Sequence, residues 1–318
     1  MSTHSNSSAA IKLFAGELAN KFDGQFFLNE LLSRHTYFKT GGSAAILVRP
    51  SSTEDLLVLR DLIAKNGLTY VFLGAGSNVL VSDAGFDGVV IDTTVMNISL
   101  REVSSNELEV GSSVKVSKFL QNCAKFGWSG FEFLAGIPGS IGGVLVMNAG
   151  THLGEVKSVV KSIQIFDFNK PNDGKLLVEL ELDETDFEYR NNKTITRSQL
   201  IWSAVFRCQR SDPLTVDSQI KTVLDRRKKT QPLNQPSCGS VFRNPALGRL
   251  KAWQVVEKLG LRGYRIGGSA FSEKHCNFIV NEKNACSSDI KALIDLAKSR
   301  AVSELGIELH EEVRYIGF

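Results

Sequence analysis

The sequence predicts an α+β fold with more than one domain. The chain has 318 residues, which is more than a single hydrophobic core usually serves. From about residue 36 onward, short apolar runs typical of strands are interleaved with segments of helical periodicity. The two kinds of element do not alternate regularly and no internal repeat is present, which favours α+β over a doubly wound sheet.

The composition is that of an ordinary globular protein. Hydrophobic residues make up 42% and charged residues 22% of the chain. The 37 basic and 34 acidic side chains leave a formal charge of +3, which is too weak to indicate a nucleic-acid or anionic-membrane partner. No apolar run is long enough to span a bilayer, so no membrane partner is expected.

The N-terminal segment, residues 1–35, is predicted to be a lead-in to the folded region. Residues 1–10 are polar and rich in Ser, which argues against a secretory signal and indicates a disordered start before a helix at 11–22. The five cysteines, at 123, 208, 238, 276 and 286, are scattered and contain no closely spaced pair. This pattern predicts reduced thiols in the cytoplasm and no zinc or other metal site.

Strands are predicted where apolar, β-branched and aromatic residues cluster. They cover residues 44–50, 70–73, 79–81, 89–91, 99–103, 108–110, 158–168, 176–182, 200–206, 278–280 and 309–316. Helices are predicted at 11–22, 56–65, 116–126, 218–229, 250–259 and 287–305. Gly67, Gly260 and Gly306 mark helix ends. Residues 127–154 are expected to form a long loop, and a composition shift near residue 210 predicts the main domain boundary.

Two glycine-rich segments are candidate ligand loops. Gly74 to Asn78 directly follows a predicted strand, and its small residues would let backbone N–H groups converge on an anion such as a pyrophosphate. A plain turn is the alternative, because the segment matches neither a P-loop nor a dinucleotide fingerprint. Residues 136–143 hold four Gly and one Pro, and the apolar residues around them fit a solvent-exposed linker poorly.

Four polar segments supply candidate chemistry. Arg190, after Tyr189, could clamp a carboxylate through two parallel hydrogen bonds, although an exposed Arg is the alternative. Ser240 lies in a polar loop and could donate a proton, with the thiol of Cys238 as a competing candidate or a packed residue. The acidic stretch 308–314 and the basic run 226–229 could each be an ordinary solvated surface, and the basic run could also hold a nucleotide diphosphate.

In this order the motifs closely resemble the UDP-N-acetylenolpyruvoylglucosamine reductase (UDP-N-acetylmuramate dehydrogenase) family. The resemblance is carried by FKTGGSA (38–44), LGAGSNVLVSDAGFDGVVI (73–91), FEFLAGIPGSIGGVLVMNAG (131–150), YR (189–190), QPLNQPSCGSVFRNP (231–245), GLRGYRIGGSAFSEKHCNFIVN (260–281) and EEVRYIG (311–317). The compact 260–275 stretch resembles the shorter subclass of the family.

The resemblance implies an FAD-binding region of the vanillyl-alcohol-oxidase type at 36–209, with lobes at 36–73 and 74–209. A smaller α+β substrate-binding domain would follow at 210–318. FAD would be bound non-covalently, since no histidine lies in the 74–78 or 136–143 loops. By motif match, the cofactor-binding residues are Thr40, Gly41, Gly42, Gly74, Ala75, Gly76, Ser77, Asn78, Gly136, Ile137, Pro138, Gly139, Ser140, Gly142 and Gly143. The substrate-binding residues are Tyr189, Asn244 and Lys229.

The resemblance also implies an activity. NADPH would reduce the bound FAD, and the reduced flavin would pass a hydride to the vinyl group of UDP-N-acetylglucosamine enolpyruvate, giving UDP-N-acetylmuramate for peptidoglycan. The protein would thus serve cell-wall biogenesis, cell shape and cell division as a cytoplasmic monomer. Arg190 would polarise the substrate carboxylate, Ser240 would protonate the carbanionic carbon and Glu312 would help polarise the carboxyl group. The family usually has Pro where this chain has Glu311, so the choice between Glu311 and Glu312 rests on the spacing to Val313.

Two other functions stay open from the sequence. One is an FAD oxidase or dehydrogenase acting on another small alcohol or acid, which would leave the 239–245 and 311–314 motifs unexplained. The other is a nucleotide-binding module without catalysis. The sequence also leaves open whether NADPH or NADH is preferred.

Overall fold

The computed structural model describes residues 3–170, 175–245 and 250–318. It divides into two compact units that are interleaved along the chain. Unit 1 comprises the described residues of Met1–Leu28, Ala45–Ala75 and Gly88–Asp225, and unit 2 those of Asn29–Ala44, Gly76–Asp87 and Arg226–Phe318. The domain boundaries predicted near residues 36 and 210 divide the chain into consecutive segments, whereas the compact units are interleaved. The predicted domains therefore stay a prediction.

The first sheet has the strand order β1-β2-β5-β3 and lies mostly in unit 1. Its strands are β1 (Gln25–Leu31), β2 (Ser43–Arg49), β5 (Phe86–Asp92) and β3 (Tyr70–Leu73). The predicted strand–helix–strand segment 44–73 is present as β2, α2 (Thr53–Asn66) and β3, but β5 separates the two strands in the sheet. β3 and β5 run parallel.

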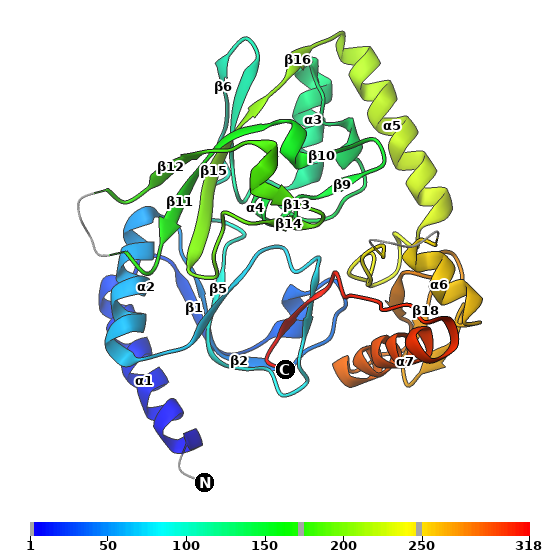
Figure 1. Ribbon diagram of the computed structural model, residues 1–318. Coiled ribbons are helices and arrows are strands. Elements are labelled where there is room, and N and C mark those ends of the chain that lie inside the picture. Colours follow the sequence, from blue (N-terminus) through cyan, green and yellow to red (C-terminus); the bar gives the residue numbers. More distant parts are fainter. Residues whose placement is uncertain (1–2, 171–174, 246–249) are drawn as a thin grey trace. The chain divides into compact units, whose positions relative to one another are not determined.

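Helices α1 (Thr3–Lys21) and α2 lie side by side (Figure 1). Both share a hydrophobic core with this sheet. The buried side chains of the two helices in this core include Ile11, Phe14, Leu18, Leu56, Leu59 and Ile63. α2 begins after Ser52, whose side chain accepts the Asp55 N–H, and ends at Gly67, which has a left-handed φ of 60°. The predicted end at Gly67 is therefore confirmed.

A second, fully antiparallel sheet of unit 1 has the order β12-β11-β15-β7-β6. Its strands are β12 (Val178–Glu181), β11 (Val160–Asp167), β15 (Gln199–Arg207), β7 (Glu107–Gly111) and β6 (Leu100–Ser104). Helix α3 (Val116–Phe126) has the predicted bounds. Val116, Phe119, Leu120 and Cys123 recur at helical spacing and are buried in a core shared with the sheet.

Short strand pairs complete unit 1. They are β9 (Gly150–Thr151) with β10 (Gly154–Glu155), β13 (Phe187–Glu188) with β14 (Asn191–Asn192), and β8 (Trp128–Ser129) with β16 (Gln209–Arg210). Single turns of 3-10 helix occur at Glu132–Leu134, Val156–Ser158 and Glu184–Asp186. The β9–β10 and β13–β14 hairpins come from segments that are more than 30 residues apart in the chain.

Unit 2 is built on its own hydrophobic core, which packs α6 (Ala252–Lys258) and α7 (Ser287–Leu305) with the strands around them. The strands are β17 (Arg265–Ile266), β18 (Ser269–Phe271) and β19 (Ile279–Asn281) in one sheet, and β4 (Val79–Val81) parallel to β20 (Arg314–Ile316) in another. A 3-10 turn at Leu32–His35 also belongs here. The chain passes from unit 1 into the last segment of unit 2 within α5 (Pro213–Thr230).

Three sequence predictions about elements are wrong. The polar start is helical from Thr3, because the buried residues of α1 nucleate a helix that extends at little further cost. The segment 127–154 is not one long loop, because α4 (Ile141–Val146) forms where Ile141, Val144 and Leu145 are buried, which offsets the cost of its two glycines. The last strand is much shorter than 309–316.

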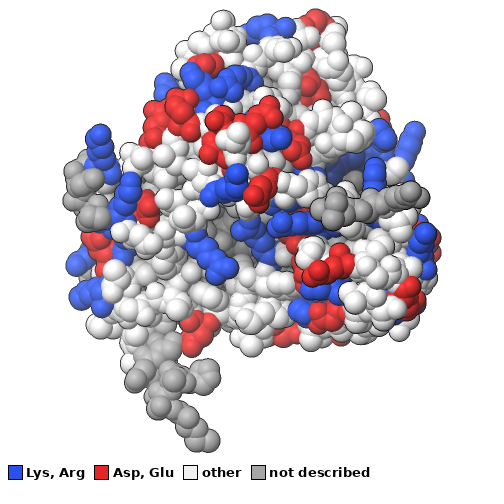
Figure 2. Space-filling model, viewed as in Figure 1, with Lys and Arg blue, Asp and Glu red and all other residues white. Residues whose placement is uncertain are grey.

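The surface carries both signs of charge, as the visible face in Figure 2 shows, in keeping with the small net charge. No helix among the described residues is long and apolar enough to cross a membrane. Within the same residues, no three His, Cys, Asp or Glu side chains are grouped so that they could hold a metal ion.

Candidate active site

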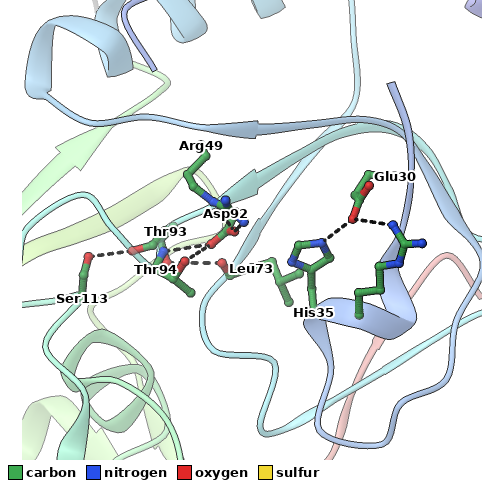
Figure 3. Close-up of polar contacts among 9 residues, drawn as sticks. Glu30, His35, Arg49, Leu73, Asp92, Thr93, Thr94 and Ser113 are labelled. Carbon is green, nitrogen blue, oxygen red and sulfur yellow. Dashed lines mark hydrogen bonds and ion pairs between the residues drawn. The ribbon is translucent and has the colours of Figure 1, made fainter. Parts of the chain in front are cut away.

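The first ligand loop starts from a firmly held strand end in unit 1. The Leu73 carbonyl accepts hydrogen bonds from the Thr93 N–H at 2.9 Å and from the Thr93 hydroxyl at 3.3 Å. The Thr93 carbonyl in turn accepts from the Ser113 hydroxyl at 2.6 Å (Figure 3). Close by, Arg49 binds Asp92 at 2.7 Å. These contacts fix the point at which the chain enters Gly74.

The second ligand loop, residues 136–143, lies against this point. A side chain built on Gly74 would find the Ser140 hydroxyl as its nearest neighbour, at 3.7 Å. The Gly142 N–H donates to the Ser112 carbonyl at 2.8 Å, and a Cβ on Gly142 would be 3.1 Å from the Ser112 Cβ. The structure therefore brings the Gly74 end of the first loop and the 136–143 loop together, and the second loop is tightly packed at Gly142.

Ser112 is a residue that sequence reasoning missed. It is 5% exposed, and its hydroxyl has no hydrogen-bond partner among the described residues. A buried hydroxyl without a partner is costly unless a ligand or water satisfies it. No sequence signal marks it, because Ser112 lies outside both glycine-rich segments and reaches the loop only through the fold.

In unit 2, the predicted turn at Thr40 to Gly42 packs against the chain after β4. The Gly42 N–H donates to the Ser82 carbonyl at 2.8 Å, and a Cβ on Gly42 would overlap the Asp83 carbonyl at 2.3 Å. Thr40 is 3% exposed, and within the described part of the chain its hydroxyl has no hydrogen-bond partner. The turn thus presents a second buried hydroxyl suited to a ligand.

Asn78 links the first ligand loop to the C-terminal strand. Its side-chain N–H donates to the Glu312 carbonyl at 3.1 Å, and its own carbonyl accepts from the Arg314 N–H at 3.0 Å. Gly76 has φ 67°, and a Cβ there would be 2.0 Å from the His35 carbonyl oxygen, so only glycine fits. Asn78 therefore positions the segment that carries Glu312, a task that its motif did not reveal.

The Ser240 loop is held by pairings on both sides in unit 2. Ser240 pairs with Phe278, Phe242 pairs with Glu311, and Val241 is fully buried between them. Gly239 has φ 86°, and Ser240 is half-buried. Its hydroxyl therefore stands in a loop whose backbone is fixed on both sides, as a proton donor requires.

Cys238 is a packed residue and a poor rival to Ser240. It is 4% exposed in the core of unit 2. Burial, and next the negative charge of Glu312, raise the pKa of its thiol well above the usual range. The thiol therefore stays neutral and enclosed.

The structure separates Glu311 from Glu312. Glu311 accepts a hydrogen bond from the Lys298 ammonium on α7 at 2.7 Å and lies 3.5 Å from the Tyr315 hydroxyl. Glu312 is half-buried and is close enough to Cys238 to raise the pKa of that thiol. Alternation along an extended chain sends neighbouring side chains to opposite sides. The geometry thus favours Glu312 as the carboxylate beside the Ser240 loop.

Arg190 lies in the turn of the β13–β14 hairpin of unit 1 with φ 59°, an uncommon value for a residue with a side chain. Its guanidinium donates to the Gly150 carbonyl at 2.9 Å, is 3.3 Å from the Glu155 carboxylate and lies over the Tyr189 ring at 4.7 Å. Tyr189 itself is 42% exposed. The Arg is therefore a fixed group and not a loose surface residue.

The other predicted substrate residues are at the start of α6 and the end of α5. The Asn244 side-chain oxygen accepts the Ala252 N–H at 3.1 Å. Lys229 is exposed in the last turn of α5, with Arg227 and Lys228. Basic residues favour a helix C-terminus, so the helix end itself accounts for the exposed Lys229 without a ligand.

We expect Glu311→Pro to leave turnover close to that of the unmodified protein. The backbone hydrogen bonds on either side of this residue are donated by the Glu312 N–H to the Val241 carbonyl and by the Arg243 N–H to the His310 carbonyl. The Glu311 N–H, which Pro would remove, takes no part in them. The change removes a partly exposed ion pair with Lys298, worth about 0–1 kcal/mol, and the long contact with the Tyr315 hydroxyl. Steady-state turnover and thermal unfolding measure this, with Glu312→Gln as the comparison. Equal loss of turnover in both variants would contradict the assignment of Glu312.

Two family models match the chain. One, described as an FAD binding domain, matches residues 44–177, and the other, described as UDP-N-acetylenolpyruvoylglucosamine reductase, C-terminal domain, matches residues 231–316. With an α+β fold and paired small-residue loops, the first match defines this chain as an FAD-binding protein. The predicted fold class and cofactor are confirmed.

Full-length relatives define the family. The UDP-N-acetylenolpyruvoylglucosamine reductase of Bacillus subtilis is 38% identical over 303 residues, 95% of this chain and 97% of that protein. The one from Rickettsia massiliae is 37% identical over 294 residues, 92% and 96% of the two chains. The crystal structure of the enzyme from Thermus caldophilus matches with a TM-score of 0.74 and 28% identity over 92% of this chain and 98% of that chain. The chain therefore belongs to the UDP-N-acetylenolpyruvoylglucosamine reductase family.

The residues present fit FAD. The cofactor has a pyrophosphate and several hydroxyl and carbonyl groups, which need protein donors and acceptors and a close backbone approach. In unit 1, the Ser112 hydroxyl beside the glycine-rich loops is such a group. Which of the predicted cofactor residues touch FAD remains a prediction.

Proposed function

We propose that this protein reduces UDP-N-acetylglucosamine enolpyruvate to UDP-N-acetylmuramate with NADPH as the reductant. The observation that carries the proposal is the 38% identity to a UDP-N-acetylenolpyruvoylglucosamine reductase across 95% of the chain. Such coverage includes both the FAD-binding residues and the C-terminal domain. The product would feed peptidoglycan synthesis. Five free cysteines, four of them buried, agree with action in the cytoplasm, and we propose a monomer.

Bound FAD supplies the hydride chemistry that no side chain provides. Reduction of the terminal vinyl carbon leaves negative charge on the neighbouring carbon and on the attached carboxylate. A site for this reaction needs a cation that stabilises the charge and an acid that completes the reduction with one proton. Three predicted residues have suitable chemistry.

Arg190 is assigned to the substrate carboxylate. A guanidinium stays charged and can hold a carboxylate through two parallel hydrogen bonds. Its fixed position supports the assignment, because the Gly150 carbonyl and the Glu155 carboxylate already hold it in unit 1. Tyr189, with its ring beneath the guanidinium, would contact the same substrate.

Ser240 is assigned as the proton donor to the carbanionic carbon, and Glu312 as the group that helps polarise the carboxyl. A serine hydroxyl is a weak acid, so the transfer depends on a strongly basic acceptor and a fixed donor. The paired backbone around Ser240 supports the assignment. Asn244 and Lys229 are kept as candidate substrate contacts.

The proposal is tested by two anaerobic mixing steps that follow the flavin absorbance. NADPH should bleach the flavin, and later addition of UDP-N-acetylglucosamine enolpyruvate should restore its colour with formation of UDP-N-acetylmuramate. The same steps with NADH establish the reductant preference. If NADPH bleaches the flavin but the protein then acts only on simple alcohols or acids, the alternative oxidoreductase is supported. A protein that takes up no FAD would refute both the reductase and the alternative oxidoreductase.

A further inference from the structure

A buried amide joins the two hairpins around Arg190. Asn148 is fully buried with φ 40°, a backbone conformation that Asn tolerates better than most residues. Its side-chain N–H groups reach the Glu188 carbonyl of β13 at 3.1 Å and the Glu155 carboxylate of β10 at 3.3 Å. Its side-chain oxygen accepts the Lys157 N–H at 3.1 Å. One side chain thus connects the β9–β10 and β13–β14 hairpins.

Glu155 presents one oxygen to each neighbour. Its Oε2 faces the Asn148 amide, and its Oε1 is 3.3 Å from Nη1 of Arg190. The side chains of Arg190 and Glu155 are 15% and 26% exposed, so their attraction is screened less than that of a surface pair. The carboxylate is therefore held on one side while it fixes the guanidinium on the other.

The guanidinium is held at both terminal nitrogens. Nη2 donates to the Gly150 carbonyl at 2.9 Å, from the same β9–β10 hairpin that carries Glu155. Because a guanidinium is planar and rigid, fixing two nitrogens fixes the direction of the whole group. The left-handed backbone at Arg190 is a costly conformation that persists only where the surroundings hold it.

We propose that Glu155, held by Asn148, is a positioning residue that orients Arg190 to receive the carboxylate of the enolpyruvyl substrate. The inference rests on the proposed role of Arg190. Glu155 acts through Arg190 and does not itself touch the substrate. The alternative is that the Glu155 carboxylate competes with the substrate carboxylate for Arg190. In that case Glu155 would weaken substrate binding instead of supporting it.

The test uses the FAD-loaded full chain with Glu155→Ala and the more conservative Glu155→Gln. Titration calorimetry measures binding of the enolpyruvyl substrate, and stopped-flow absorbance measures the NADPH and substrate steps separately. We expect Glu155→Ala to weaken binding and to slow the substrate step by about 10- to 100-fold, the size typical for loss of an orienting partner. Glu155→Gln, which keeps a side-chain oxygen, should fall between, and the NADPH step should be unchanged.

Glu184→Ala is the matched control. Its carboxylate is 69% exposed and pairs with Lys157 at 3.5 Å, so its loss should leave both steps unchanged. Tighter substrate binding by either Glu155 variant would show competition and overturn the proposal. An equal slowing of both steps would show a merely structural role and would also overturn it. If Glu155→Ala loses its flavin, Glu155→Gln decides between these outcomes.

A double-mutant cycle with Arg190→Lys separates this inference from the proposed function. If Glu155 acts through Arg190, Glu155→Ala should add little to the defect of Arg190→Lys, whereas independent residues would give additive effects. Additive effects would refute the positioning role alone. A normal substrate step in Arg190→Lys itself would instead refute the role assigned to Arg190.

Discussion

Ser240→Ala is expected to abolish turnover of the enolpyruvyl substrate while NADPH still reduces the flavin. The variant removes one hydroxyl from a loop whose backbone is fixed by pairing with Phe278 and by the adjacent Phe242 pairing. Loss of a general acid typically lowers the rate by about 10²- to 10⁴-fold. Stopped-flow absorbance should therefore show normal bleaching by NADPH and almost no return of colour with substrate.

A second serine of the same loop provides the control. Ser237 is buried, and its hydroxyl accepts the Gly239 N–H at 3.4 Å, so it supports the backbone. Ser237→Ala should cost some stability and leave the substrate step largely intact. Normal substrate turnover by Ser240→Ala would remove this serine from the mechanism, and Cys238 could not replace it easily because its thiol is enclosed in the core of unit 2.

Local signals explain what the sequence predicted correctly. Helix α3 has its predicted bounds because its apolar residues repeat at helical spacing and Gly127 ends it in a left-handed conformation. The same holds for α7 and Gly306. Such features depend on neighbours within a few residues, so a single sequence contains them.

Elements that depend on distant partners were missed. The glycines of α4 predict a loop, and only burial of its apolar residues in the core of unit 1 makes it a helix. Strand β1 is mostly exposed and shows no clear alternation, so its sequence carries no strand pattern. The two compact units are each built from separated segments that come together only in the fold.

The candidate site shows the same division. Motif matches led to Arg190 and Ser240, but the groups that hold Arg190 were not found. Asn148 lies within the 131–150 motif but was given no role, and Glu155 lies outside every motif. Both reach Arg190 only because two hairpins more than 30 residues apart come together. The spacing to Val313 predicts Glu312, and the contact of Glu311 with Lys298, which the sequence does not show, supports that prediction.

Arg190→Lys is expected to slow the substrate step by about 100-fold or more, the size that follows loss of one well-placed donor to a developing anion. The guanidinium spans the Gly150 carbonyl and the Glu155 carboxylate with different nitrogens. A lysine ammonium is a single point charge, so it cannot hold both groups and also grip a carboxylate through two parallel bonds. Substrate binding should weaken together with the rate.

The defect should be chemical and not a folding defect. Lysine tolerates the left-handed backbone at position 190 no worse than arginine, so the variant should keep its fold and its flavin. Loss of the contacts with Gly150 and Glu155 should lower the free energy of unfolding by about 1–3 kcal/mol. Arg207→Lys is the matched control in the same unit, because Arg207 is exposed. Within the described residues, its guanidinium donates one hydrogen bond, to the Val160 carbonyl at 3.0 Å. Near-native kinetics in Arg190→Lys would show that a positive charge alone suffices there, and the two-pronged hold on the carboxylate would have to be abandoned.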